Sequence, residues 1–126
     1  MDKTFLWGEA PYAVQFTANV VGEDIVVIVS GGEKPHVGAV AVSLPRPSLA
    51  DPSVNSSSTS VFTLTGHKED DLAKALAAKI AASLKKNVVL TAGIHLDGIS
   101  GDGIKQIQNN CQKAADQLIK EFTKIF

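Results

Sequence analysis

Histidine and carboxylate side chains are the residues of this sequence best suited to chemistry. The three histidines, His36, His67 and His95, each fall at an end of an expected strand. In the apolar run that begins at Asn87, a two-residue period puts His95 and Asp97 on one face. A buried strand that places a histidine and a carboxylate at alternate positions predicts a ligand site at its end. That face contains Thr91, Gly93, His95 and Asp97, and the opposite face contains Val88, Leu90, Ala92, Ile94 and Leu96.

Glycines accompany two of these histidines. Gly93 comes two residues before His95, and His36 shares a face with Gly38 in the same way. Because glycine has no Cβ, backbone or a flat ligand can approach such a position closely. The alternative is that His95 bonds to Asp97 or to a neighbouring backbone group and completes an ordinary strand end. The sequence leaves both interpretations open.

A metal site is a second possibility for the histidines. Zinc accepts three histidines and a water, and Asp97 could add an oxygen ligand. The spacings of 31 and 28 residues between successive histidines match no local metal motif. A metal site would therefore require the fold to bring the three together.

Arg46 is the only arginine, and it stands between two prolines with Ser48 close behind. Prolines stiffen the backbone and hold the direction of the side chain. A guanidinium group there can bind phosphate or carboxylate through two parallel hydrogen bonds. The alternative is a surface arginine in a flexible loop.

The segment Gly66-His67-Lys68 opens an expected helix, where free backbone N–H groups favour an anion. Three acidic residues follow directly and weaken this signal. Cys111 falls on the apolar stripe of the last expected helix, where a cysteine is most often a small core residue. The sequence therefore gives nucleophilic catalysis little support.

Composition predicts a single domain over residues 1–126. Apolar residues make up 44% of the chain, and 12 basic and 13 acidic residues give a net charge of −1. Without a basic stripe, nucleic-acid binding is not expected. A lone cysteine cannot form an internal disulfide and fits a reducing compartment. With no signal peptide or membrane span expected, the prediction is a cytoplasmic protein that does not bind membranes.

The pattern of the chain predicts an α+β fold of two layers. Strands are expected in the order β-β-β-β-α-β-α, in a mostly antiparallel sheet of five to six strands with two helices on one face. The first three strands should form an antiparallel meander because their connections are short. A long loop rich in proline and serine follows. The expected strands are 12–21, 25–30, 36–44, 59–65 and the run from 87, the loop is 45–58, and the helices are 66–86 and the segment capped by Ser100.

Three segments in succession resemble the family of prenylated-flavin chaperones associated with gallate decarboxylase. They are HVGAVAVSLPRPSL, the stretch ending in TSVFTLTGHKEDDLAKALA, and VVLTAGIHLDGIS, which together cover roughly residues 36–107. The resemblance implies a fold like that of the dimeric proteasome-assembly chaperones. It also implies a non-enzymatic protein that binds prenylated flavin mononucleotide (FMN), or FMN, and passes it to a UbiD-like decarboxylase while protecting it.

On this hypothesis the candidate residues form two sets, one that would bind the phosphate of the flavin and one that would line its ring system. Arg46 and Ser48 would bind the phosphate, with help from Gly66, His67 and Lys68. The ring system would be lined by His36, His95 and Asp97, with Gly38 and Gly93 leaving room for it. Two alternatives remain: a dimeric protein-assembly chaperone without a small ligand, and an enzyme that uses the histidines with or without metal.

Overall fold

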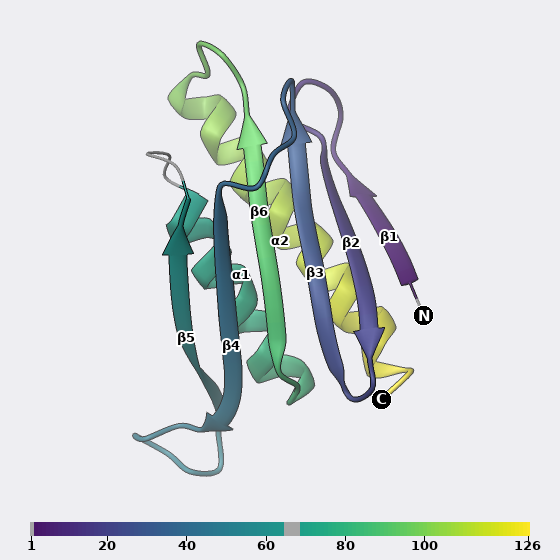
Figure 1. Ribbon diagram of the computed structural model, residues 1–126, viewed down its shortest axis with the longest axis vertical. Coiled ribbons are helices and arrows are strands. Elements are labelled where there is room, and N and C mark those ends of the chain that lie inside the picture. The colour runs from purple at the N-terminus through teal and green to yellow at the C-terminus, as the bar shows by residue number, and fades with distance from the viewer. Residues whose placement is uncertain (1, 65–68) are drawn as a thin grey trace.

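The computed structural model describes residues 2–64 and 69–126, which form one six-stranded sheet with two helices. The helices lie side by side behind the sheet, so the molecule has two layers (Figure 1). The predicted α+β, two-layer architecture is confirmed. The elements are β1 (Asp2–Trp7), β2 (Val14–Val21), β3 (Asp24–Gly32), β4 (Ala39–Pro47), β5 (Asn55–Thr63), α1 (Glu69–Leu84), β6 (Val88–His95) and α2 (Gly101–Thr123).

The spatial order of the strands is β1-β2-β3-β6-β4-β5. Four neighbouring pairs are antiparallel, and β3 pairs with β6 in parallel. The expected antiparallel meander is therefore wrong beyond its first hairpin. β6 lies between β3 and β4, because the chain crosses from one to the other over the end of β6 at residues 33–38. β1, which no expected strand covered, is an edge strand that buries Phe5 alone.

The core lies between the sheet and the helices. Alternate residues of β2, β3, β4 and β6 point into it, as the two-residue period of a strand requires. Most of the predicted apolar stripe of α2 is buried, but Ile104 and Ile125 are exposed. Ser100 caps α2 as predicted, since its hydroxyl accepts a hydrogen bond from the N–H of Gly103 at 3.0 Å. The buried set includes Phe16, Val27, Ala41, Leu76, Ile80, Leu90, Cys111, Leu118 and Phe122.

The expected loop over residues 45–58 is wrong at both ends. β4 continues to Pro47 and β5 begins at Asn55. Prolines are tolerated there because β6 pairs with β4 only as far as Ser43. Beyond Ser43, β4 forms no backbone hydrogen bonds with β6 on that side, so a missing N–H costs little. Serine is tolerated in β5 because Ser57 donates a hydrogen bond to the carbonyl of Ala78 in α1, at 3.1 Å.

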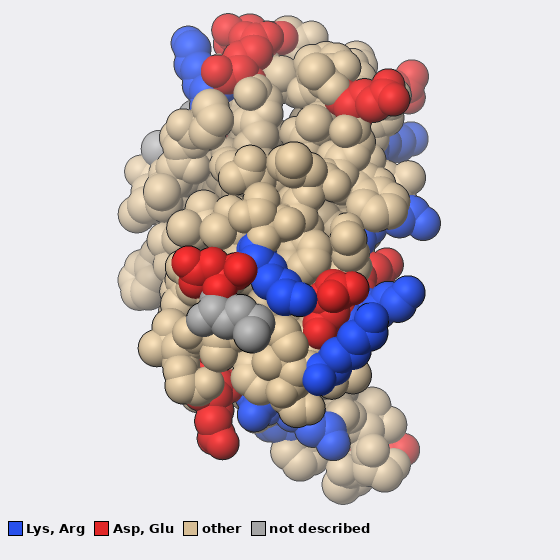
Figure 2. Space-filling view, turned by 90° about the vertical axis from the view of Figure 1, so that its right-hand side faces the viewer, with Lys and Arg blue, Asp and Glu red and all other residues tan. Residues whose placement is uncertain are grey.

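The face of the sheet opposite the helices is covered by no element of the described chain (Figure 1). It exposes large apolar side chains from five of the six strands. They include Leu6, Val21, Ile28, Val42, Leu44 and Phe62, of which Leu6 and Phe62 are 69% and 67% exposed. On the side of the molecule nearest β1, charged residues of both signs lie at the top and over the lower half, with a largely uncharged region between them (Figure 2). No helix in residues 2–64 and 69–126 has the length and apolar character needed to cross a membrane.

Candidate functional site

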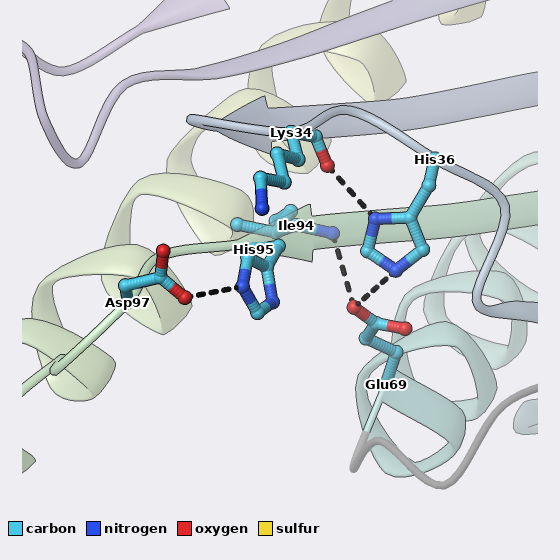
Figure 3. Close-up of polar contacts among 6 residues, drawn as sticks. All are labelled: Lys34, His36, Glu69, Ile94, His95 and Asp97. Atoms are coloured by element: carbon cyan, nitrogen blue, oxygen red, sulfur yellow. Dashed lines mark hydrogen bonds and ion pairs between the residues drawn. The ribbon is translucent and has the colours of Figure 1, made fainter.

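Five of the ten predicted site residues come together at one end of the sheet. His95 ends β6, and His36 lies in the segment just before β4, with their ring centroids 6.3 Å apart (Figure 3). Gly38, Gly93 and Asp97 lie beside them in the chain. The expectation that His36 and Gly38 belong to a strand is wrong, because β4 begins at Ala39. Here the chain crosses β6 instead of pairing along it.

Glu69, the first residue of α1, forms the centre of this cluster, although its place in the sequence indicates only an acidic helix start. Its Oε1 lies 3.1 Å from Nε2 of His36 and accepts a hydrogen bond from the N–H of Ile94 at 3.2 Å. The other ring nitrogen of His36, Nδ1, lies 2.9 Å from the carbonyl oxygen of Lys34. A carbonyl oxygen can only accept, so Nδ1 is the donor in this contact.

The two glycines of the cluster make room for protein groups. A Cβ built on Gly93 would overlap the carbonyl group of His36, and one built on Gly38 would overlap the carboxylate of Glu69. The close approach predicted from these glycines is therefore made by backbone and by a neighbouring side chain. Neither position has open space above it for a flat ligand.

His95 and Asp97 form a second histidine–carboxylate pair. Nε2 of His95 lies 2.8 Å from Oδ1 of Asp97. This hydrogen bond, the charge of His95 and the charge of Lys34 together hold the pKa of Asp97 below its usual range. The alternative interpretation of the sequence, in which the two residues bond to each other at the strand end, is confirmed.

A pocket of about 400 Å³ opens beside His95 and Glu69. It lies between the start of α1, the end of β6 and the start of α2. Sequence reasoning missed it because its lining comes from three segments far apart in the chain. The one available signal was Ile104, which continues the apolar stripe of α2 beyond the part that the core covers. The lining residues are Glu69, Asp71, Leu72, Ile94, His95, Leu96, Ile99, Ile104, Ile107 and Gln108.

Arg46 and Ser48 lie at the opposite end of β4. At about 3.3 Å per residue, Arg46 is about 26 Å along the strand from Gly38. Its Nε donates to the hydroxyl of Ser58 at 2.8 Å, and its Nη1 donates to the carbonyl of Pro47 at 2.9 Å. The structure therefore does not bring Arg46 and Ser48 together with the predicted ring-lining residues within one chain.

The remaining predicted positions, Gly66, His67 and Lys68, lie outside the described residues. Within residues 2–64 and 69–126, no group of three or more His, Cys, Asp or Glu side chains is arranged to hold a metal ion. Burial raises the pKa of the Cys111 thiol to about 12, so it is not a ready nucleophile.

The comparison with solved structures identifies the fold. The chain superposes on a member of a solved chaperone complex for assembly of the yeast 20S proteasome with a TM-score of 0.60, covering 95% of this chain and 97% of that one. Sequence identity is 17%, so the likeness concerns the fold. The fold is thus like that of a chain in a proteasome-assembly chaperone complex, as the resemblance implied.

The sequence comparisons define the family. The model described as "Prenylated flavin chaperone LpdD-like domain" matches residues 8–123. Protein LpdD of Lactiplantibacillus plantarum is 30% identical over 97 residues, which are 77% of this chain and 68% of that protein. The chain belongs to the LpdD-like prenylated flavin chaperone family, and the predicted resemblance is confirmed.

Proposed function

We propose that the protein is a non-catalytic chaperone that binds prenylated FMN, or FMN, and delivers it to a UbiD-like decarboxylase. The observation that carries this proposal is the family match over residues 8–123. The pocket beside His95 supports it, because its volume of about 400 Å³ falls in the usual range of small-molecule sites, roughly 300–1,000 Å³.

The ring system of the flavin belongs, on this proposal, at the end of the sheet that carries His36 and His95. Both imidazoles are held in place by carboxylates, so they offer polar contacts at fixed positions beside an aliphatic pocket. Arg46 and Ser48 are too far away to bind the phosphate of the same ligand from the same chain. They can contribute only if a second chain presents them.

A homodimer through the uncovered face of the sheet is part of the proposal. Six strands about 4.8 Å apart and about 26 Å long present roughly 750 Å² per chain, close to the roughly 800 Å² per partner of a standard interface. The charged residues that the strand register places on this face, Asp2, Asp24 and Arg46, lie at its ends. Two copies can therefore meet without burying like charges at the centre.

The dimer is tested by placing a charge at the centre of this face, on the interior strand β3. Ile28→Asp should convert a dimer into a folded monomer in sedimentation velocity, because a charge buried without a partner costs several kcal/mol. Leu49→Asp, on a hairpin tip where the side chain is 90% exposed, is the matched control and should remain dimeric. A wild-type monomer at micromolar concentration would exclude the dimer.

The flavin is tested by native mass spectrometry on anaerobically purified protein, with FMN and prenylated FMN added separately. We expect one flavin per chain, and delivery to an apo-decarboxylase that then becomes active. His95→Ala should weaken binding about tenfold, the effect of one lost hydrogen bond to a polar group. Arg46→Ala should leave binding unchanged if one chain forms the site, and weaken it if two chains share the ligand. A protein that takes up neither flavin would refute the proposed function.

A further inference from the structure

The pocket beside His95 is lined mainly by aliphatic side chains, together with a few polar groups. Six aliphatic side chains line it, from α1, from the end of β6 and its following loop, and from the first turns of α2. Polar groups enter it from Glu69, Asp71, His95 and Gln108. The aliphatic residues are Leu72, Ile94, Leu96, Ile99, Ile104 and Ile107.

Ile104 shows that part of this aliphatic surface is not covered by the core. It lies in the first turn of α2 and remains 45% exposed, whereas Ile107, one turn further on, is 8% exposed. Water filling a pocket with such walls finds few hydrogen-bond partners, so an apolar occupant is favoured over water.

Charge decides which part of a ligand this pocket accepts. The carboxylates of Glu69 and Asp71 are among its lining groups, and no lysine or arginine of the described chain is. The carboxylate of Asp71 disfavours an anionic phosphate there, and that of Glu69 is already paired with His36. An uncharged, carbon-rich portion of a ligand fits both the walls and the charges.

We propose that this pocket receives the apolar ring that prenylation adds to the flavin, and so makes the protein select prenylated FMN over FMN. This inference rests on the proposed function, and it assigns the selectivity to residues of the pocket. The prenyl-derived unit contributes five carbons. Burying two or three of them favours the prenylated flavin by at least about tenfold in dissociation constant.

Ile104→Thr tests the inference, because the Ile104 side chain is 45% exposed and its loss should not unfold the domain. Dissociation constants for prenylated FMN and FMN are measured anaerobically by flavin fluorescence for each protein. In Ile104→Thr we expect the constant for prenylated FMN to rise about five- to tenfold and that for FMN to change less than about twofold. Ile125→Thr is the matched control, an isoleucine 38% exposed just beyond α2 and outside the pocket, and should alter neither constant.

A second variant reduces the same selectivity by adding side-chain volume instead of removing it. Ile104→Trp fills the pocket, so prenylated FMN should lose its advantage and bind about as well as FMN. The inference is overturned if wild-type protein binds both flavins equally, or if Ile104→Thr weakens both to the same degree or neither. Uptake of neither flavin by the wild type would instead remove the proposed function on which the inference rests.

Discussion

The two ends of β4 are built in different ways. At the His36 end, the contacts join residues far apart in sequence, since Glu69 bonds to the backbone of Ile94, 25 residues away, and pairs with His36 from another segment. At the Arg46 end, the side chain bonds to Ser58 across a hairpin and to its own neighbour Pro47. The first end depends on the whole fold, whereas the second depends on one hairpin. Substitutions should therefore cost much more at the first end.

The largest effect is expected from Gly93→Ala. The new Cβ would overlap the carbonyl group of His36, so the crossing segment must move away from β6. We expect the free energy of unfolding to fall by about 3 kcal/mol, at the upper end of overpacking effects. Urea unfolding followed by circular dichroism measures it.

Gly101→Ala is the control for this glycine. Gly101 opens α2, where a Cβ has nothing within 4 Å and the φ angle is not positive. The change should be neutral or stabilise by up to about 1 kcal/mol. If the two variants had equal stability, the inference that His36 packs tightly against β6 at Gly93 would be wrong.

A smaller loss is expected from Glu69→Ala. It leaves the N–H of Ile94 without its acceptor and His36 without its carboxylate partner, in a place where Glu69 was 8% exposed. The expected cost is about 2 kcal/mol, typical of a buried polar group deprived of its partner. Arg46→Ala, at the other end of β4, should cost less than about 0.5 kcal/mol because its contacts are local and exposed. Similar losses for both variants in urea unfolding would remove the contrast between the ends.

The smallest effect concerns two exposed carboxylates, one near each end of β4. The pKa of Asp97 is lowered by its hydrogen bond to His95 and by the charges of His95 and Lys34, whereas the pKa of Asp51 is lowered by hydrogen bonds from Ser53 alone. Salt screens charges but not short hydrogen bonds. About 0.5 M NaCl should therefore raise the pKa of Asp97 more than that of Asp51, as measured by NMR titration of the two side chains.

The sign of the corresponding stability change follows from these directions. Both carboxyl groups have lowered pKa values in the folded state. Each therefore contributes stability that is complete above the ordinary aspartate pKa of about 3.9 and is lost as the pH falls through the folded value. Asp97→Asn should abolish the salt-sensitive part of this acid dependence and leave the part due to Asp51. Equal salt responses of the two groups would show that charge plays no part at Asp97.

Periodicity was sufficient to predict most of the fold. Alternation in β2, the helical stripe of α2 and the Ser100 cap all depend on local pattern, and they were predicted correctly. The position of β6 between β3 and β4 was not predictable, because short connections favour a meander and nothing local records a crossover. The strand at residues 55–58 was missed since its serines look like a loop until the carbonyl of Ala78 is placed beside Ser57.

The candidate site was predictable in part for the same reason. The alternation of Gly93, His95 and Asp97 correctly indicated a polar strand end. Glu69 was overlooked because an acidic residue at a helix start has an ordinary explanation, and its contact with His36 spans 33 positions of the chain. Arg46 was assigned to the same ligand site as the histidines because its guanidinium suits a phosphate, and the sequence contains no information on their distance. The length of β4 separates Arg46 from His36 and His95.

The placement of β6 also determines when the sheet can be completed during synthesis. β1, β2 and β3 form one antiparallel piece, and β4 and β5 form another, and in the described sheet these two pieces are joined through β6. On the ribosome, both pieces leave the exit tunnel before Val88–His95 is available to connect them. The nascent chain therefore waits with two open sheet edges, which are the surfaces most prone to wrong pairing. Slow translation ahead of residue 88 should lengthen that exposure, and a chain shortened to end before Val88 should aggregate.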